Sequence, residues 1–152
     1  MKKKPKKRLD FLGQTKPAVS NQYKILPPHI GYYKKFPAFS FKYYMDKDKD
    51  LSFLRITDCS NFHTMFSNFH KMSKLLWQEI KKAEQFHAHE ILDESKIPGR
   101  IKSHLNKIGA EDLMPFQFKA FNEKRIVGFF NSEDVFEIVC CDFLHEIYQR
   151  PH

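Results

Sequence analysis

The clearest hydrophobic pattern is an amphipathic stretch near the middle of the chain, where apolar residues recur every three or four positions and lysines fall between them. This spacing predicts one long helix with Ser60 or Asn61 as its N-cap and a single apolar face. That face consists of Phe62, Met65, Phe66, Phe69, Met72, Leu76, Ile80 and Ala83. Such a stripe is typical of a helix that packs on a protein core.

A second, shorter helix is predicted between a proline and a glycine. Pro98 suits the first turn of a helix, and Gly109 suits the position just past its end. Ile101 and Leu105 are four residues apart, so they share one face. We therefore predict a helix between residues 98 and 109.

Two apolar stretches before the long helix alternate in the manner of strands. Residues 39–44 alternate with a period of two, and residues 51–57 form a second stretch beyond the charged turn at 46–50. The simplest interpretation is a β-hairpin.

The C-terminal third predicts three further strands, over residues 116–121, 125–130 and 135–142, joined by short polar turns. The last is almost wholly apolar and is expected near the centre of the sheet. The order hairpin, helix, helix, meander predicts an α+β fold. Its antiparallel sheet combines the N-terminal hairpin with the three-stranded meander, and two helices pack on one face.

Charge is distributed unevenly along the 152 residues. Residues 1–36 contain ten Lys or Arg and one acidic residue, whereas residues 37–152 contain sixteen Lys or Arg and seventeen acidic residues. We therefore predict a basic, largely flexible leader (1–36) and one α+β domain (37–152). The run Lys3, Lys4, Lys6, Lys7 and Arg8 is either functional, as a tether for phosphate backbones or an address tag, or a solubilising tail, and the sequence favours neither.

Several protein classes are excluded by what the sequence lacks. No apolar run is long enough for a membrane span, and the basic N-terminus lacks the apolar segment of a secretory signal. The cysteine count is odd, and Cys140 and Cys141 are adjacent in a predicted strand, so their side chains point to opposite faces. A reducing, cytoplasmic location is expected. With five glycines and no phosphate-binding loop, no cofactor is expected.

The histidines of the middle region give two weaker signals. His87 and His89 are two residues apart and would not share a helical face, so we predict a solvated helix end and no metal site. His63 and His70 share a face of the long helix with Lys74 nearby. These three either line a phosphate-binding surface or form an ordinary exposed polar face.

Residues that suit phosphodiester cleavage gather around the last three strands. Arg125 opens the middle strand, and His145 and Tyr148 follow the last one, so antiparallel pairing brings these segments together. A guanidinium stabilises charge on phosphorus, a histidine protonates the leaving oxygen, and Glu137 is the candidate base. Tyr148 alternatively stacks on a base. Lys119 and Lys124 are candidate substrate-binding residues. A structural interpretation is also open, with Asp142 paired to His145.

The segment KRIVGFFNSEDVFEIVCCDFLHEIY, residues 124–148, resembles the closing hairpin of the RelE/ParE superfamily of bacterial toxins. In that pattern an arginine opens one strand, a short acidic turn follows, and an apolar strand ends in histidine and tyrosine. The resemblance implies that Arg125 binds phosphate and that His145 and Tyr148 lie near the C-terminal catalytic position. It further implies metal-free cleavage of messenger RNA, in some relatives on the ribosome, and neutralisation by an antitoxin protein.

Two functional hypotheses follow. The first is the toxin component of a toxin–antitoxin system, a metal-free endoribonuclease whose partners are RNA and an antitoxin, with no membrane association. The second is a non-catalytic module of the same fold that binds nucleic acid or protein through its basic leader.

Overall fold

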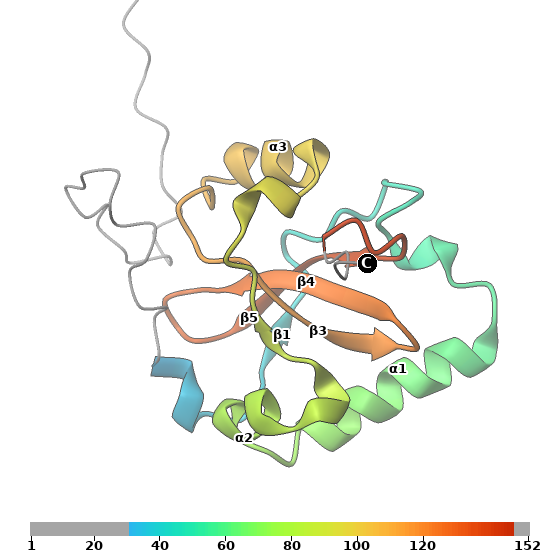
Figure 1. Ribbon diagram of the computed structural model, residues 1–152, viewed down its shortest axis with the longest axis vertical. Helices are drawn as coiled ribbons and strands as arrows, with labels where there is room; N and C mark the ends of the chain where they lie inside the picture. The colour runs from blue at the N-terminus through green and yellow to red at the C-terminus, as the bar shows by residue number, and fades with distance from the viewer. Residues whose placement is uncertain (1–30, 148–152) are drawn as a thin grey trace, which may run out of the picture.

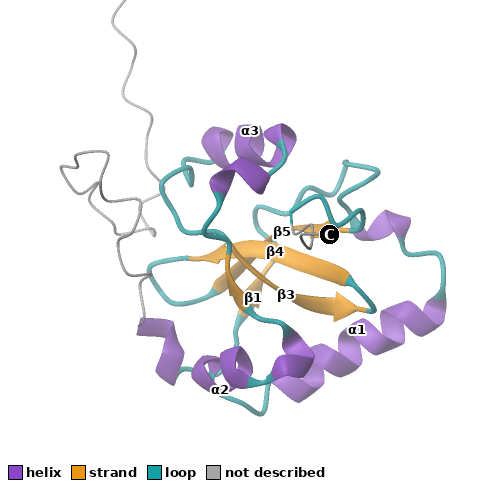
Figure 2. Ribbon diagram, in the orientation of Figure 1, coloured by secondary structure: helices purple, strands orange, loops and turns teal. Residues whose placement is uncertain are grey.

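The computed structural model describes residues 31–147, which form a five-stranded sheet with helices on both faces (Figure 1 and Figure 2). The strands lie in the order β1-β5-β4-β3-β2. Their bounds are β1 Phe39–Ser40, β2 His89–Glu90, β3 Phe116–Phe121, β4 Lys124–Phe130 and β5 Phe136–Asp142. β1 runs parallel to β5, and the other neighbouring pairs are antiparallel. The α+β class is as predicted, but the sheet is mixed rather than antiparallel.

The three central strands confirm the predicted meander, with one irregularity in the pairing of β4 with β5. Val127 faces Cys140, whereas the next residue of β4, Gly128, faces Ile138. Strand β5 therefore carries one extra residue, Val139, at a β-bulge. Every residue pair between this bulge and the N-terminal end of β4 is shifted by one residue relative to the pairs on the other side of the bulge.

The single long helix that the sequence predicted is two helices, α1 (Cys59–Met72) and α2 (Trp77–Lys82). Between them Leu76 is extended, with ψ of 152°, and the Trp77 backbone N–H donates to the Lys35 carbonyl at 3.0 Å. The break turns the Trp77 ring into the core, where it is fully buried. Its ring lies against those of Phe116, Phe130 and Phe136. Burial of this large side chain outweighs the few hydrogen bonds of a continuous helix.

The helix boundaries follow local capping chemistry. Asp58 caps α1 by accepting a hydrogen bond from the Ser60 backbone N–H at 2.8 Å, so the two predicted N-caps lie within the first turn. The third helix, α3, spans Gly99–Lys107 directly after Pro98. Gly109 follows it in the left-handed region, with φ of 74°, as expected for a residue that ends a helix.

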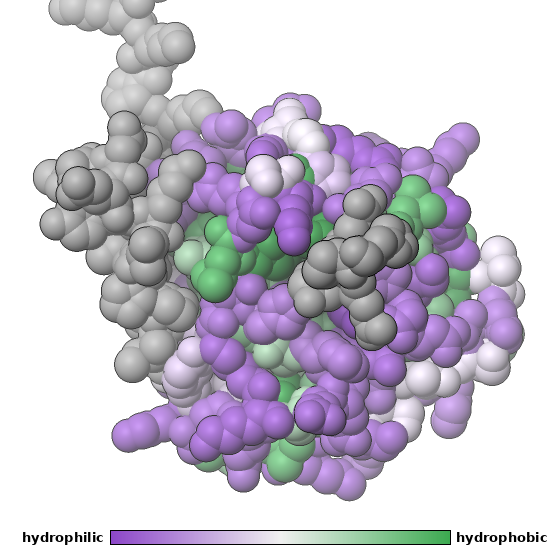
Figure 3. All heavy atoms as spheres, viewed as in Figure 1, coloured by the Kyte–Doolittle hydropathy of each residue, from purple (hydrophilic) through white to green (hydrophobic). Residues whose placement is uncertain are grey.

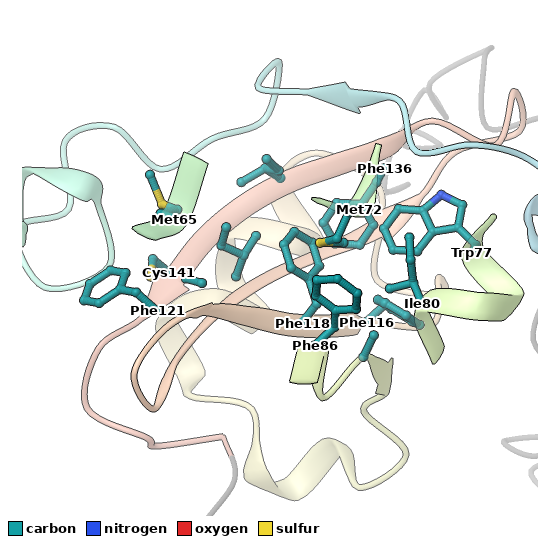
Figure 4. Packing of buried hydrophobic residues seen from close by; sticks show 14 of the residues in the cluster. Met65, Met72, Trp77, Ile80, Phe86, Phe116, Phe118, Phe121, Phe136 and Cys141 are labelled. Atoms are coloured by element: carbon teal, nitrogen blue, oxygen red, sulfur yellow. The ribbon is translucent and has the colours of Figure 1, made fainter. Parts of the chain in front are cut away.

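Helices cover both faces of the sheet, which corrects the prediction of two helices on one face. α1 and α2 pack on the face that contains Ile126 and Cys141 (Figure 4). α3 packs on the opposite face, with Val127 and Cys140. Consecutive residues of a strand point to opposite faces of the sheet. A strand with apolar side chains on both faces therefore needs other elements packed on each face. The opposed orientation of the two adjacent cysteines is confirmed.

The predicted N-terminal hairpin is also wrong. β1 is only two residues long and pairs with β5, while the supposed second strand contains the short 3₁₀ turn Phe53–Arg55. Two hydrogen bonds of 2.8 Å attach this region to β5 instead, from Met45 N–H to the Val139 carbonyl and from Cys141 N–H to the Leu51 carbonyl. The chain between these two bonds therefore follows the edge of β5 and does not form a β-hairpin.

The segment around His89 forms a strand, not the predicted solvated helix end. His89 and Glu90 constitute β2, which pairs with the start of β3. The His89 Nε2 atom lies 3.0 Å from Nε2 of Gln117 on β3. His87, just before, adopts a left-handed conformation with φ of 44°. This conformation lets the chain turn from α2 into the sheet edge.

The described end of the predicted leader packs onto the domain. Tyr32 lies in the 3₁₀ turn Gly31–Lys34, is 2% exposed, and stacks on Phe130 with ring centroids 3.6 Å apart. Lys35 forms an ion pair with Asp134 at 2.6 Å. Hydrophilic side chains predominate on the face of the molecule seen in Figure 3, and apolar atoms show just below α3. Between residues 31 and 147, no helix combines the length and apolar character that a membrane span requires.

We predict that Gly128→Ala destabilises the protein by about 3 kcal/mol because its backbone approaches β5 too closely for a side chain. A Cβ atom there would lie 2.0 Å from the Glu137 carbonyl oxygen and 2.8 Å from the Phe136 ring. Urea unfolding measures the loss. Gly99→Ala is the control, since nothing lies within 4 Å of its Cβ position, and it should gain about 0.5 kcal/mol. A Gly128→Ala variant with the wild-type midpoint would contradict this description.

Candidate functional site

A row of charged side chains crosses the sheet at one end. Arg125 on β4 faces Lys119 on β3 and Asp142 on β5. Side chains in such a row lie on the same face, roughly 5 Å apart at Cβ. Arg125 is two residues from Val127 and therefore shares the α3 side of the sheet. The expectation that Arg125 approaches the segment beginning at Asp142 is confirmed.

Asp142 organises the turn that follows β5. One carboxylate oxygen accepts a hydrogen bond from the Glu146 N–H and the other from the Ile147 N–H, both at 3.1 Å. His145 within this turn is left-handed, with φ of 56°. The two hydrogen bonds of Asp142 thus hold the backbone of the turn that carries the imidazole. Arg100 of α3 supports the same turn through Glu146, at 3.8 Å.

Glu123 joins the arginine to the histidine. Its Oε2 atom lies 3.4 Å from Nη2 of Arg125 and 3.9 Å from Nε2 of His145. The side chains of Arg125, His145 and Glu123 are 6%, 28% and 60% exposed, so the carboxylate lies on the solvent side. His145 Nε2 is itself buried, and no hydrogen bond to it is present within residues 31–147. We call these three residues the Arg–Glu–His cluster.

Sequence reasoning missed Glu123, which it placed in a turn, and assigned the carboxylate role to Glu137. The structure also has Glu123 in the turn between β3 and β4, one residue before β4 begins, and the signal that could have found it is its closeness in sequence to Arg125. Glu137 faces Phe129, four residues along β4 from Arg125, or about 13 Å away at strand spacing. The structure therefore does not bring Glu137 to the cluster.

Glu137 has a separate and buried environment. It is 3% exposed, and its Oε1 atom accepts a hydrogen bond from Asn131 Nδ2 at 2.9 Å. Its Oε2 atom is buried and accepts no hydrogen bond from the described part of the chain. This carboxylate supports the turn between β4 and β5 at the far end of the sheet.

The two predicted substrate-binding lysines of the sheet divide between its faces. Lys119 faces Arg125 and belongs with the cluster. Lys124 precedes Arg125 and points the other way, where its Nζ donates to the Phe143 carbonyl at 2.6 Å. The remaining predicted residues lie outside the described residues. These are Tyr148 and the leader residues Lys3, Lys4, Lys6, Lys7 and Arg8.

A second ionic group lies at the β2 edge of the sheet and has a structural role. The Glu90 carboxylate on β2 accepts hydrogen bonds from Lys81 at 2.5 Å and from Tyr32 at 2.9 Å. Burial, the largest single effect, would raise the pKa of Glu90, but its hydrogen bonds and the charge of Lys81 together outweigh burial, and the pKa is lowered. Burial would likewise lower the pKa of Lys81, yet its hydrogen bonds to Glu90 and Tyr33 leave that pKa raised. Both groups are charged at neutral pH and fasten the N-terminal turn to α2 and β2.

The Arg–Glu–His cluster brings a carboxylate, an imidazole and a guanidinium within 4 Å contacts. Within residues 31–147 no group of three or more His, Cys, Asp or Glu side chains is placed to hold a metal ion. Comparisons of the chain with known protein families, with curated proteins and with solved structures gave no match.

We predict that Asp142→Asn lowers stability by about 2 kcal/mol and releases His145 from its position. The amide keeps one acceptor but turns an NH₂ group toward a backbone N–H, so one hydrogen bond becomes a clash of donors. Urea unfolding gives the stability, and the His145 ring resonances in NMR spectra should move toward those of free histidine. Asp46→Asn, at an exposed turn, is the control and should change neither. If the two variants behaved alike, Asp142 would not be holding this turn.

Proposed function

We propose that this chain is the toxin component of a toxin–antitoxin pair, and that it cleaves RNA in the cytoplasm without a metal ion. The observation that carries the proposal is the contact of one carboxylate, Glu123, with both the Arg125 guanidinium and the His145 imidazole. Metal-free cleavage next to a 2′-hydroxyl requires a base, a proton donor and a cation at one phosphate, and Glu123, His145 and Arg125 are proposed for these functions in that order.

The proposed reaction is an internal transfer of the phosphodiester. Glu123 takes the proton of the 2′-hydroxyl, and the resulting oxygen attacks the adjacent phosphorus. The bond from phosphorus to the 5′-oxygen breaks, and protonated His145 gives its proton to that oxygen. The products are a 2′,3′-cyclic phosphate and a 5′-hydroxyl end. Glu123 gains one proton and His145 loses one, so proton exchange with water restores the enzyme.

Arg125 and Lys119 supply positive charge for the phosphorane that forms during this transfer. The guanidinium is 6% exposed and is further oriented by a hydrogen bond to the Lys124 carbonyl at 3.3 Å. A fixed cation in a poorly hydrated position stabilises developing negative charge more strongly than one in water. Lys119 adds a second cation in the same cross-strand row.

Two further features support the proposal. A histidine at positive φ costs on the order of 1 kcal/mol, and such strained positions are concentrated at functional sites. The resemblance of residues 124–148 to RelE/ParE toxins implies phosphate binding by Arg125 and a position of His145 near the C-terminal catalytic residue, which agrees with the proposal. It also supports an antitoxin protein as partner and messenger RNA, in some relatives on the ribosome, as substrate.

A second candidate function is the non-catalytic binding module. The burial of Arg125 favours it, because a guanidinium that is already paired with Glu123 is available to a phosphate only if that carboxylate moves. In this alternative the charged row stabilises the end of the sheet, and binding takes place elsewhere.

We predict that expression of the wild-type protein in bacteria without its antitoxin arrests growth, and that Glu123→Gln and His145→Asn each relieve the arrest. Each should lower RNA cleavage by the purified protein about a hundredfold, the usual contribution of a general acid or base. Asparagine is chosen at position 145 because it tolerates positive φ. Urea unfolding should show little change in His145→Asn and a modest loss of stability in Glu123→Gln, which removes the charge partner of Arg125.

Matched controls separate catalysis from folding. His87→Asn changes another histidine at positive φ, and Glu133→Gln changes an exposed glutamate in the turn at the other end of the sheet. Both should remain toxic. A wild-type protein that is harmless and cleaves no RNA, on or off ribosomes, would exclude the nuclease and favour the binding module.

A further inference from the structure

The outer face of α1 carries an aromatic residue between two histidines. His63, Phe66 and His70 lie on one exposed stripe of the helix, and Lys74 continues it just beyond the C-terminus. Phe66 is 61% exposed, whereas Met65 points into the core (Figure 4). The long apolar stripe predicted from sequence is therefore only partly buried, and one of its rings faces solvent.

This ring belongs to a larger aromatic surface along the outer edge of β1. The ring of Phe66 lies 6.1 Å from that of Phe69, which lies 4.8 Å from that of Phe39. Two residues beyond Phe39, Phe41 is 52% exposed and its ring lies 6.3 Å from that of Phe53. We call these five residues the aromatic edge.

The chain segment that supplies this surface carries an excess of positive charge. Residues 31–78, which contain all five rings, hold eight Lys or Arg and four Asp, although residues 37–152 as a whole contain more acids than bases. Two of these four, Asp48 and Asp50, are paired with Arg100 of α3. Among the lysines, Lys35 is paired with Asp134. Lys71 and Lys74 are exposed and take part in none of the ion pairs among the described residues. An anionic ligand therefore meets a net attraction here.

We propose that the aromatic edge and the adjoining α1 lysines bind single-stranded nucleic acid. Bases stack on Phe66 and Phe41, while Lys71 and Lys74 neutralise phosphates, which is the usual combination on single-strand platforms. Exposed rings on a chain segment with twice as many cations as acids match a polymer of bases and phosphates.

The position of α1 links this surface to the end of the sheet that holds the Arg–Glu–His cluster. Asn68 Nδ2 donates to the Ala120 carbonyl at 2.8 Å, and Ala120 is three residues before Glu123. The aromatic edge lies on the α1 side and Arg125 on the α3 side. Binding at the aromatic edge is thus separate from the proposed cleavage and holds whether or not the cluster is catalytic.

Fluorescence anisotropy with a labelled 20-nucleotide 2′-O-methyl uridine strand tests the proposal on the full chain, because this strand lacks the 2′-hydroxyl that cleavage needs. Phe66→Ala should weaken binding about tenfold, the effect of losing one stacked base. Lys71→Gln with Lys74→Gln should weaken binding and reduce its salt dependence. An abasic strand with the same phosphates should bind the wild-type protein no better than the uridine strand binds Phe66→Ala.

Matched controls lie away from this surface. Leu92→Ala removes another exposed apolar side chain, and Lys102→Gln with Lys107→Gln neutralises two exposed lysines of α3. These variants and His145→Asn should bind as the wild type does, so loss of cleavage and loss of binding are distinguishable. Equal binding by Phe66→Ala and wild type would overturn the proposal. So would Phe66-dependent binding to phosphatidylserine vesicles with no Phe66 dependence for the uridine strand.

Discussion

The position of one β-bulge decides which residues meet at the charged end of the sheet. Gly128 approaches the β5 backbone so closely that a Cβ would lie 2.0 Å from the Glu137 carbonyl oxygen. The extra residue, Val139, follows two positions later on β5. Beyond the bulge, Arg125 faces Asp142; with unbroken pairing it would face Cys141, whose thiol belongs to the other side of the sheet. The register of two strands thus gives a buried guanidinium a carboxylate as its cross-strand neighbour.

The geometry of the cluster follows from this pairing. A buried arginine is tolerated only where opposite charge and hydrogen-bond acceptors lie near it. Glu123 forms the ion pair at 3.4 Å, and Asp142 adds a carboxylate on the neighbouring strand. Asp142 also holds the backbone of the turn after β5 and so places His145 beside Glu123. The contacts that make Arg125 acceptable in a folded protein therefore also bring a carboxylate, an imidazole and a guanidinium together. For this reason stability and the proposed catalysis depend on shared residues.

Local signals predicted the central meander, α3 and the candidate pair Arg125 and His145, because each rests on short-range periodicity or on proline and glycine chemistry. The division of the long helix depends on the insertion of Trp77 among distant phenylalanines, which no window around residue 77 reveals. Likewise, the parallel pairing of β1 with β5 is a contact between residues almost one hundred positions apart. The choice of Glu123 over Glu137 required the strand register, because both glutamates lie on or beside the same strands.

The most direct test of the Arg–Glu–His cluster is the chemistry of the RNA ends. Purified protein should cut RNA in the presence of EDTA and leave 2′,3′-cyclic phosphate and 5′-hydroxyl ends, which mass spectrometry identifies. A substrate with a 2′-deoxy sugar at the cleaved position should stay intact, because the attacking hydroxyl is missing. Cleavage of the deoxy substrate, 5′-phosphate ends, or complete inhibition by EDTA would contradict a mechanism in which Glu123, Arg125 and His145 supply all of the chemistry.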